Sequence, residues 1–127
     1  LKNVLKTVRK IPHKRLITLF GCGGDRDRGK RPKMACIAAE YSDFVIITSD
    51  NPRTEEPTAI ISEVETGMGE NKNYIKIIER GEAIRYACKN LNAGDILLLA
   101  GKGHEDYQII GDNKIYFDDR EEVKKEL

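Results

Sequence analysis

The sequence has no tryptophan, two histidines and only three cysteines among its 127 residues. Cys22, Cys36 and Cys88 are odd in number and form no CxxC pair, so neither a disulfide framework nor a zinc site is indicated. We expect reduced thiols, with Cys36 and Cys88 in the core and Cys22 filling space under a tight turn. No Ser-His-Asp or Cys-His arrangement is suggested, and two histidines are too few for a rich metal site.

Long apolar runs are also missing, since none approaches the roughly 20 residues that a membrane-spanning helix needs. The net charge of +1 is too near neutral to indicate binding to nucleic acid or to a membrane. The amino terminus shows no signal-peptide pattern, which together with the thiols predicts a cytoplasmic protein. A chain that begins with Leu1 rather than Met is expected to be part of something larger.

What the chain does contain is typical of one globular domain with one core, spanning residues 1–127. Apolar segments alternate with amphipathic segments of about ten residues, which predicts βαβ units and a mostly parallel α/β sheet flanked by helices. We expect strands at 15–20, 43–48, 74–78 and 95–100, helices at 1–9, 32–41, 57–66, 80–91 and 119–127, and an antiparallel edge hairpin at 107–110 and 114–117.

Three polar, glycine-bearing loops follow three of these strands, at residues 21–30, 50–53 and 101–105. The carboxyl ends of parallel strands lie at one edge of the sheet, where open α/β sheets bind their ligands. We therefore expect the loops to converge on one rim, and we interpret that rim as the functional site.

The first loop nearly matches a P-loop, because residues 24–30 fit G-x-x-x-x-G-K. Arg31 stands where a Ser or Thr hydroxyl should ligate magnesium, and Asp25 and Asp27 would repel phosphate oxygens, so a nucleoside triphosphate is not expected here. The basic residues of the loop are either a solvated charge run or, at Arg26, an anion site close to backbone N–H groups. Both interpretations fit the residues.

In the second loop, Pro52 stiffens the turn and presents Arg53 from a fixed backbone. The planar guanidinium suits a carboxylate held through two hydrogen bonds. Asp50 and Asn51 offer acceptors for an ammonium or amide, so the loop suits both charges of a free amino acid. An ordinary Asx-Pro turn with a surface arginine fits the same residues.

In the third loop, Gly101 and Gly103 let the backbone bend closely round a ligand. Glu105 offers a carboxylate to a cation. His104 is either a proton carrier or a residue that orients its neighbours.

Taken together and in order, these stretches resemble the carboxy-terminal domain of the Mur ligases. The resemblance rests on FGCGGDRD at 20–27 with GKRP at 29–32, TSDNPRTE at 48–55, AGKGHE at 100–105 and FDDRE at 117–121. It covers nearly the whole chain and implies a Rossmann-like, mostly parallel sheet, in agreement with the pattern of strands and helices.

The resemblance also implies an activity for the larger protein, which is ATP-dependent amide ligation in peptidoglycan synthesis. In that reaction ATP with Mg²⁺ phosphorylates the carboxylate of a UDP-N-acetylmuramoyl-L-alanyl-D-glutamate substrate. The amine of an amino acid then attacks the resulting acyl phosphate. The Asp-Asn-Pro-Arg motif implies meso-diaminopimelate as that amino acid. The far end of diaminopimelate carries a carboxylate beside the ammonium, and Arg53 can bind that carboxylate. Lysine has no carboxylate at its far end.

Carried over residue by residue, the resemblance implies a substrate site made of Arg26, Asp50, Asn51, Pro52, Arg53, Gly101 and Glu105. Arg26 and Arg53 would meet carboxylates, while Glu105 and the Gly101 carbonyl would meet the distal ammonium. No catalytic residue or metal ligand is assigned. The family's motifs for ATP, Mg²⁺ and the UDP-sugar are absent here, so we expect the chain alone to catalyse nothing.

Three alternatives fit less well. A lysine-adding member of the same family would make poor use of Arg53. A stand-alone α/β module that binds a small anion should have its own initiator Met and a capped first helix. A receiver-like signalling domain needs an acidic cluster, whereas Asp25 and Asp50 lie among basic or proline neighbours.

Overall fold

The computed structural model describes residues 1–24, 28–100, 107–110 and 113–126. Its helices are α1 (Lys2–Arg9), α2 (Lys30–Tyr41), α3 (Pro57–Glu65), the short 3₁₀ helix η1 (Thr66–Met68), α4 (Arg80–Lys89) and α5 (Asp119–Glu126). Its strands are β1 (Leu16–Cys22), β2 (Phe44–Ser49), β3 (Tyr74–Lys76), β4 (Ile96–Ala100), β5 (Tyr107–Ile110) and β6 (Asn113–Tyr116). Every predicted element is present, with boundaries moved by a few residues.

The main sheet has four parallel strands in the order β3-β2-β1-β4. This confirms the predicted mostly parallel α/β fold. The chain adds β2 and β3 on one side of β1 and then returns to place β4 on the other side, so the strand order reverses between β1 and β4. In doubly wound sheets, ligands bind outside the carboxyl ends of the strands at such a reversal.

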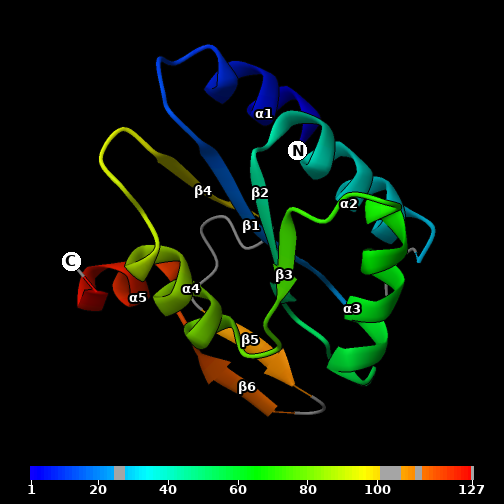
Figure 1. Ribbon diagram of the computed structural model, residues 1–127. Helices are drawn as coiled ribbons and strands as arrows, with labels where there is room; N and C mark the ends of the chain where they lie inside the picture. Colours follow the sequence, from blue (N-terminus) through cyan, green and yellow to red (C-terminus); the bar gives the residue numbers. More distant parts are fainter. Residues whose placement is uncertain (25–27, 101–106, 111–112, 127) are drawn as a thin grey trace.

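Helices cover both faces of this sheet, with α1, α2 and α3 on one side and α4 and α5 on the other (Figure 1). The pleat explains the arrangement, because alternate residues of one strand face opposite layers. Phe20 of β1 packs in the core cluster with α2 and α3, whereas Leu19 packs in the cluster with α4. The central strand β1 is buried along its whole length, as a strand covered on both faces should be.

A proline lies in the first turn of each of the two helices that follow the first two loops. Pro57 is in the first turn of α3, and Pro32 lies in the first turn of α2, where a missing N–H costs nothing. The 3₁₀ helix η1 was not predicted, since the expected helix at 57–66 ends where η1 begins. There Gly67 packs so closely on α2 that an added Cβ would lie 1.9 Å from the carbonyl oxygen of Pro32.

The remaining expectations concern the hairpin and the thiols. β5 and β6 are antiparallel as predicted, but the expectation of an edge hairpin is wrong, because among the described residues they form a two-stranded sheet separate from the main one. Cys22 is buried, but the expectation that Cys36 is core is wrong, because its side chain points to solvent, and Cys88 is only partly buried. The buried face of α2 contains Ala35 instead, one residue away.

Candidate functional site

The first two loops meet at the carboxyl edge of the sheet because their strands are neighbours. Cys22 at the end of β1 pairs with Ser49 at the end of β2, and Phe20 pairs with Ala100 at the end of β4. The structure therefore brings residues 50–53 against Gly23 and Gly24. Three of the predicted site residues, Arg26, Gly101 and Glu105, lie outside the described residues.

Gly24 is the point of closest approach between the two loops. Its N–H donates to the carbonyl oxygen of Asn51 at 2.6 Å, and an added Cβ would lie 1.8 Å from the carbonyl oxygen of Pro52. Gly21 is similar, since its Cβ would lie 2.7 Å from the carbonyl oxygen of Thr48. The structure requires glycine at both positions because neighbouring backbones leave no room for a side chain.

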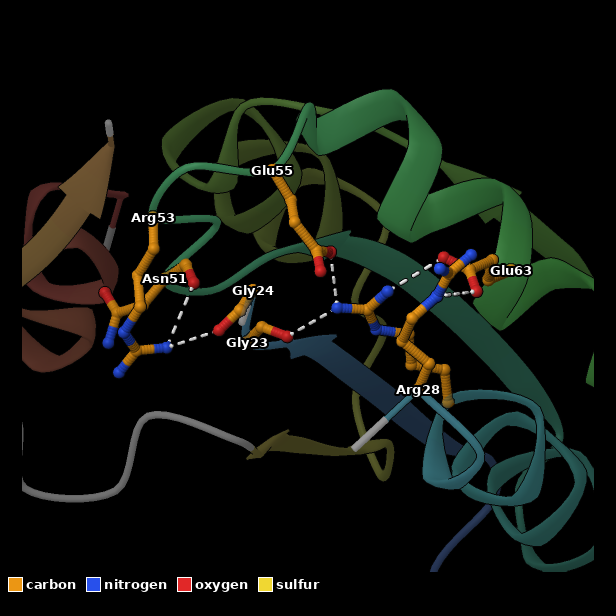
Figure 2. A network of polar contacts seen from close by, with 8 residues as sticks. Gly23, Gly24, Arg28, Asn51, Arg53, Glu55 and Glu63 are labelled. Atoms are coloured by element: carbon orange, nitrogen blue, oxygen red, sulfur yellow. Dashed lines mark hydrogen bonds and ion pairs between the residues drawn. The ribbon is translucent and has the colours of Figure 1, made fainter. Parts of the chain in front are cut away.

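Arg53 has an unusual backbone and an anchored side chain. Its φ is 53°, and it is the only residue other than glycine with a positive φ in the part of the chain that the structure describes. The left-handed conformation costs an L-residue roughly 1–2 kcal/mol. Its Nη1 donates to the carbonyl oxygens of Gly24 at 3.0 Å and Asn51 at 3.3 Å (Figure 2). Backbone carbonyls of both loops therefore hold the Arg53 guanidinium.

Asp50 and Asn51 are buried at the base of this loop. The backbone carbonyl of Asn51 is a joint acceptor, since it receives both the Gly24 N–H and the Arg53 guanidinium. One carbonyl thus couples the position of the first loop to the direction of Arg53. Pro52 contributes its own carbonyl, which accepts from the Glu55 N–H at 3.0 Å and closes the turn.

Arg31 is a residue whose setting the sequence did not reveal. It belongs to the run of basic residues that was interpreted as either solvated or anion-binding, yet its side chain is buried. The guanidinium donates to Glu63 at 2.8 Å, to Glu55 at 2.6 Å and to the carbonyl oxygen of Gly23 at 3.0 Å. The partner carboxylates lie 24 and 32 residues away in the sequence, so no local pattern identifies them.

These contacts also test the resemblance of residues 24–30 to a P-loop. The position that should supply a magnesium-ligating hydroxyl holds the buried Arg31, whose cation is committed to Glu55 and Glu63. A second cation next to that guanidinium would be repelled. The described residues here do not fit a magnesium nucleotide, and they contain no cluster of three or more possible metal ligands.

Arg80 is a second buried arginine at the same edge of the sheet. At the start of α4, it donates to the carbonyl oxygens of Ser49 and Ala100, both at 3.2 Å. It also donates twice to the carboxylate of Asp119 in α5, at 2.8 and 2.7 Å. Ser49 and Ala100 are the last residues of β2 and β4, so Arg80 fixes the points from which the second and third loops depart.

Among the described residues near the rim, the titratable groups show no sign of a nucleophile. Burial raises the pKa of the Cys22 thiol to about 11, and the Sγ atom lies 3.6 Å from the sulfur of Met34. The thiol is therefore protonated at neutral pH and packs as a small apolar group. The hydrogen bond from Arg28 is the main reason that the pKa of Glu63 lies below its ordinary value, with Arg31 adding to it. What the described rim offers is fixed donors and acceptors, which suit binding.

In the part of the chain that the structure describes, no helix is long and apolar enough to cross a membrane.

Comparisons with known proteins give one consistent result. Residues 1–103 match the family described as Mur ligase, glutamate ligase domain. Relatives named UDP-N-acetylmuramoyl-L-alanyl-D-glutamate--2,6-diaminopimelate ligase are 57% identical in Geobacter sulfurreducens, over 97% of this chain and 27% of the relative, and 52% identical in Listeria monocytogenes, over 98% and 25%.

A solved structure titled as a ligase of the same name is similar to this chain with a TM-score of 0.93 and 44% sequence identity. The similarity covers 98% of this chain and 26% of the solved one. The chain therefore spans about a quarter of the length of the curated relatives it matches, and its fold agrees with the corresponding part of a solved relative.

Proposed function

The chain belongs to the family of Mur ligase, glutamate ligase domains, and on that premise we propose that it recruits meso-diaminopimelate for ligation to UDP-N-acetylmuramoyl-L-alanyl-D-glutamate. The larger protein is then an ATP-dependent ligase of bacterial peptidoglycan synthesis, at work in the cytoplasm. This chain would serve as its carboxy-terminal domain and hold the incoming amino acid.

The observation that carries this proposal is the anchoring of Arg53 at the rim. Its Nη1 is held by two backbone carbonyls, one from each loop, on a strained backbone. Such strain persists where the surroundings impose it, and it is concentrated at binding sites. A guanidinium fixed in this way has lost its rotational freedom before the ligand arrives, so less of the binding energy is spent on ordering the side chain.

The chemistry of the loop matches a zwitterionic ligand. Diaminopimelate carries a carboxylate and an ammonium at both ends, whereas lysine has only an ammonium at its far end. We assign the distal carboxylate to Arg53, with Asp50, Asn51 and Pro52 forming the loop that presents it. Arg26, Gly101 and Glu105 complete the proposed site, with Arg26 meeting a carboxylate and Glu105 meeting the ammonium together with the Gly101 carbonyl.

We expect ATP and Mg²⁺ to bind mainly outside this chain. The P-loop-like stretch is unsuited to a magnesium nucleotide because Arg31 occupies the hydroxyl position and is paired with Glu55 and Glu63. We therefore expect the 127-residue chain by itself to release no ADP when it is supplied with ATP, Mg²⁺, diaminopimelate and the UDP-dipeptide. The task assigned to this chain is to bind and orient the amino acid.

The test is a calorimetric titration of the full-length ligase with meso-diaminopimelate and with L-lysine, in the presence of an ATP analogue and the UDP-dipeptide. The wild type should prefer diaminopimelate. Arg53→Ala should weaken diaminopimelate binding by about 2–5 kcal/mol, or at least about 30-fold in Kd, because it leaves a carboxylate without its partner. Lysine binding should change much less.

The matched control is Arg85→Ala, which removes an exposed arginine from α4. It should leave both affinities unchanged. Equal affinity of the wild type for lysine, or an unchanged Kd for diaminopimelate in Arg53→Ala, would overturn the assignment and favour the lysine-adding alternative.

A further inference from the structure

Arg31 is placed where it can control the two loops of the proposed site. Its side chain is only 2% exposed, and its three acceptors among the described residues come from different segments. Gly23 belongs to the first loop, Glu55 follows the second loop, and Glu63 lies on α3. One rigid guanidinium therefore ties both loops to a helix of the scaffold.

Arg31 and Arg53 donate hydrogen bonds to neighbouring carbonyls of the same backbone segment. Arg31 donates to the carbonyl oxygen of Gly23. Arg53 donates to that of Gly24 (Figure 2). The Gly24 N–H in turn donates to Asn51, whose carbonyl also receives Arg53. A shift of Gly23 away from Arg31 would move the Gly24 carbonyl and, with it, the anchor of the Arg53 guanidinium.

The cost of this arrangement argues against simple space filling. Among the described residues, the buried Nε of Arg31 has no hydrogen-bond partner. An unsatisfied buried donor is destabilising, and a buried ion pair is often no more stable than apolar residues of the same volume. An apolar side chain could not hold the Gly23 carbonyl and the Glu55 carboxylate at a fixed separation.

We propose that Arg31 is a positioning residue of the amino-acid site, which sets the direction of Arg53 by fixing Gly23 and Glu55 relative to α3. The inference rests on the proposed function for the identity of the ligand. Arg31 itself does not touch the amino acid, so its removal should weaken binding of the amino acid without abolishing it.

Arg28 supplies a matched control within the same cluster. It donates to Oε1 of Glu63 at 2.8 Å, whereas Arg31 uses Oε2 of the same carboxylate. Its side chain is exposed, and its contact among the described residues joins its own position in the first loop to α3 without involving Gly23 or Glu55. Arg28→Ala thus removes a cation next to Glu63 but leaves the two loops tied together.

The experiment measures KM for diaminopimelate, KM for ATP and kcat in the full-length ligase by ADP release. Arg31→Lys keeps the charge, but an ammonium on a single stem cannot reach all three acceptors. It should raise KM for diaminopimelate about tenfold or more, because small misplacements of binding groups are costly. KM for ATP should stay within about twofold in the same variant. Arg28→Ala should leave both KM values unchanged.

Two further variants separate positioning from loss of folding. Glu55→Gln removes the loop-side charge at a partly exposed carboxylate, and it should reproduce the effect of Arg31→Lys with a smaller change in Tm. In an Arg53→Ala background, Arg31→Lys should add little to KM for diaminopimelate, since residues acting through one another are not additive.

The outcomes distinguish this inference from the proposed function. A raised KM for diaminopimelate in Arg53→Ala, with an unchanged KM in both Arg31→Lys and Glu55→Gln, would overturn the role of Arg31 alone. Equal rises in the two KM values, or full additivity with Arg53→Ala, would reduce Arg31 to a structural residue. An unchanged KM for diaminopimelate in Arg53→Ala would overturn the proposed function, and the positioning role with it.

Discussion

Arg80 grips Asp119 through two parallel hydrogen bonds, although the two residues lie 39 positions apart in the sequence. Nε reaches Oδ1 at 2.8 Å and Nη2 reaches Oδ2 at 2.7 Å, and both side chains are almost fully buried. The same guanidinium holds the last carbonyls of β2 and β4. This pair therefore joins α5 to the strand ends from which the second and third loops leave.

The first prediction concerns that pair. Arg80→Met should lower the free energy of unfolding by about 3–5 kcal/mol, because it leaves the Asp119 carboxylate buried without its partner. Urea denaturation of the 127-residue chain measures the change. Arg85→Met removes an exposed arginine from the same helix and should stay within about 0.5 kcal/mol of the wild type. If Arg80→Met and Arg85→Met were equally stable, the buried pair would contribute nothing to the fold.

The contrast between Arg80 and Arg85 also shows what sequence patterns cannot predict. Alternating apolar and amphipathic segments predict the α/β fold, because the period of side-chain exposure follows directly from strand and helix geometry. The placement of residues 50–53 on the rim followed from the same rule. The burial of Arg31 and Arg80 did not, since a charged residue is normally solvated and the partners of these two lie 8 to 39 residues away.

The glycines and Cys36 show the same limit on a smaller scale. A Gly-rich stretch predicts freedom of the backbone, but the need for Gly24 comes from the Pro52 carbonyl, which belongs to another loop. Cys36 was expected to be core because its neighbours are apolar, and it is exposed because α2 buries Ala35 and Ala38 instead. A helix with short buried residues on one side gives a weak pattern, so a misassignment by one position is easy.

The second prediction tests the close approach at Gly24. Gly24→Ala should destabilise the chain, because its Cβ would lie 1.8 Å from the Pro52 carbonyl oxygen and one of the two loops must move. In the full-length ligase the same change should weaken binding of diaminopimelate, since the Gly24 carbonyl anchors Arg53. Gly69→Ala is a useful comparison, because an added Cβ meets nothing within 4 Å there and any cost comes from its φ of 57° alone.

The two readouts for Gly24→Ala are unfolding in urea and calorimetric Kd. Gly69→Ala should cost about 1–3 kcal/mol of stability from backbone strain and leave the Kd unchanged. A Gly24→Ala protein that bound diaminopimelate with the wild-type Kd would show that the contact between the loops is unimportant for the site.

The third prediction concerns pH and the pair of Arg15 and Asp95. Arg15 Nη2 lies 2.6 Å from Asp95 Oδ2, and this hydrogen bond, with the Asn92 N–H, lowers the pKa of Asp95 below its ordinary value of 3.8. Because the folded-state pKa is depressed, the stabilisation is fully present above pH 3.8 and is lost as the pH falls through the lower folded value.

Asp95→Asn should therefore be less stable than the wild type at neutral pH, and the difference should shrink as the pH drops below about 3.8. Urea denaturation at a series of pH values from 7 to about 2.5 measures it. Glu40→Gln, at an exposed position of α2, controls for the loss of one negative charge. A difference between Asp95→Asn and the wild type that stayed constant over this range would contradict the role of the ion pair.

The fourth prediction separates the backbone of Arg53 from its side chain. Arg53→Ala loses the hydrogen bonds to Gly24 and Asn51 but keeps a φ of 53° that alanine also resists. Arg53→Gly loses the same hydrogen bonds and removes the strain, so it should be more stable than Arg53→Ala by about 1 kcal/mol. Both variants should lose diaminopimelate binding to the same extent, because binding depends on the guanidinium. If Arg53→Gly proved less stable than Arg53→Ala in urea, the loop would not be strained. If it retained wild-type binding, the guanidinium would not contact the ligand.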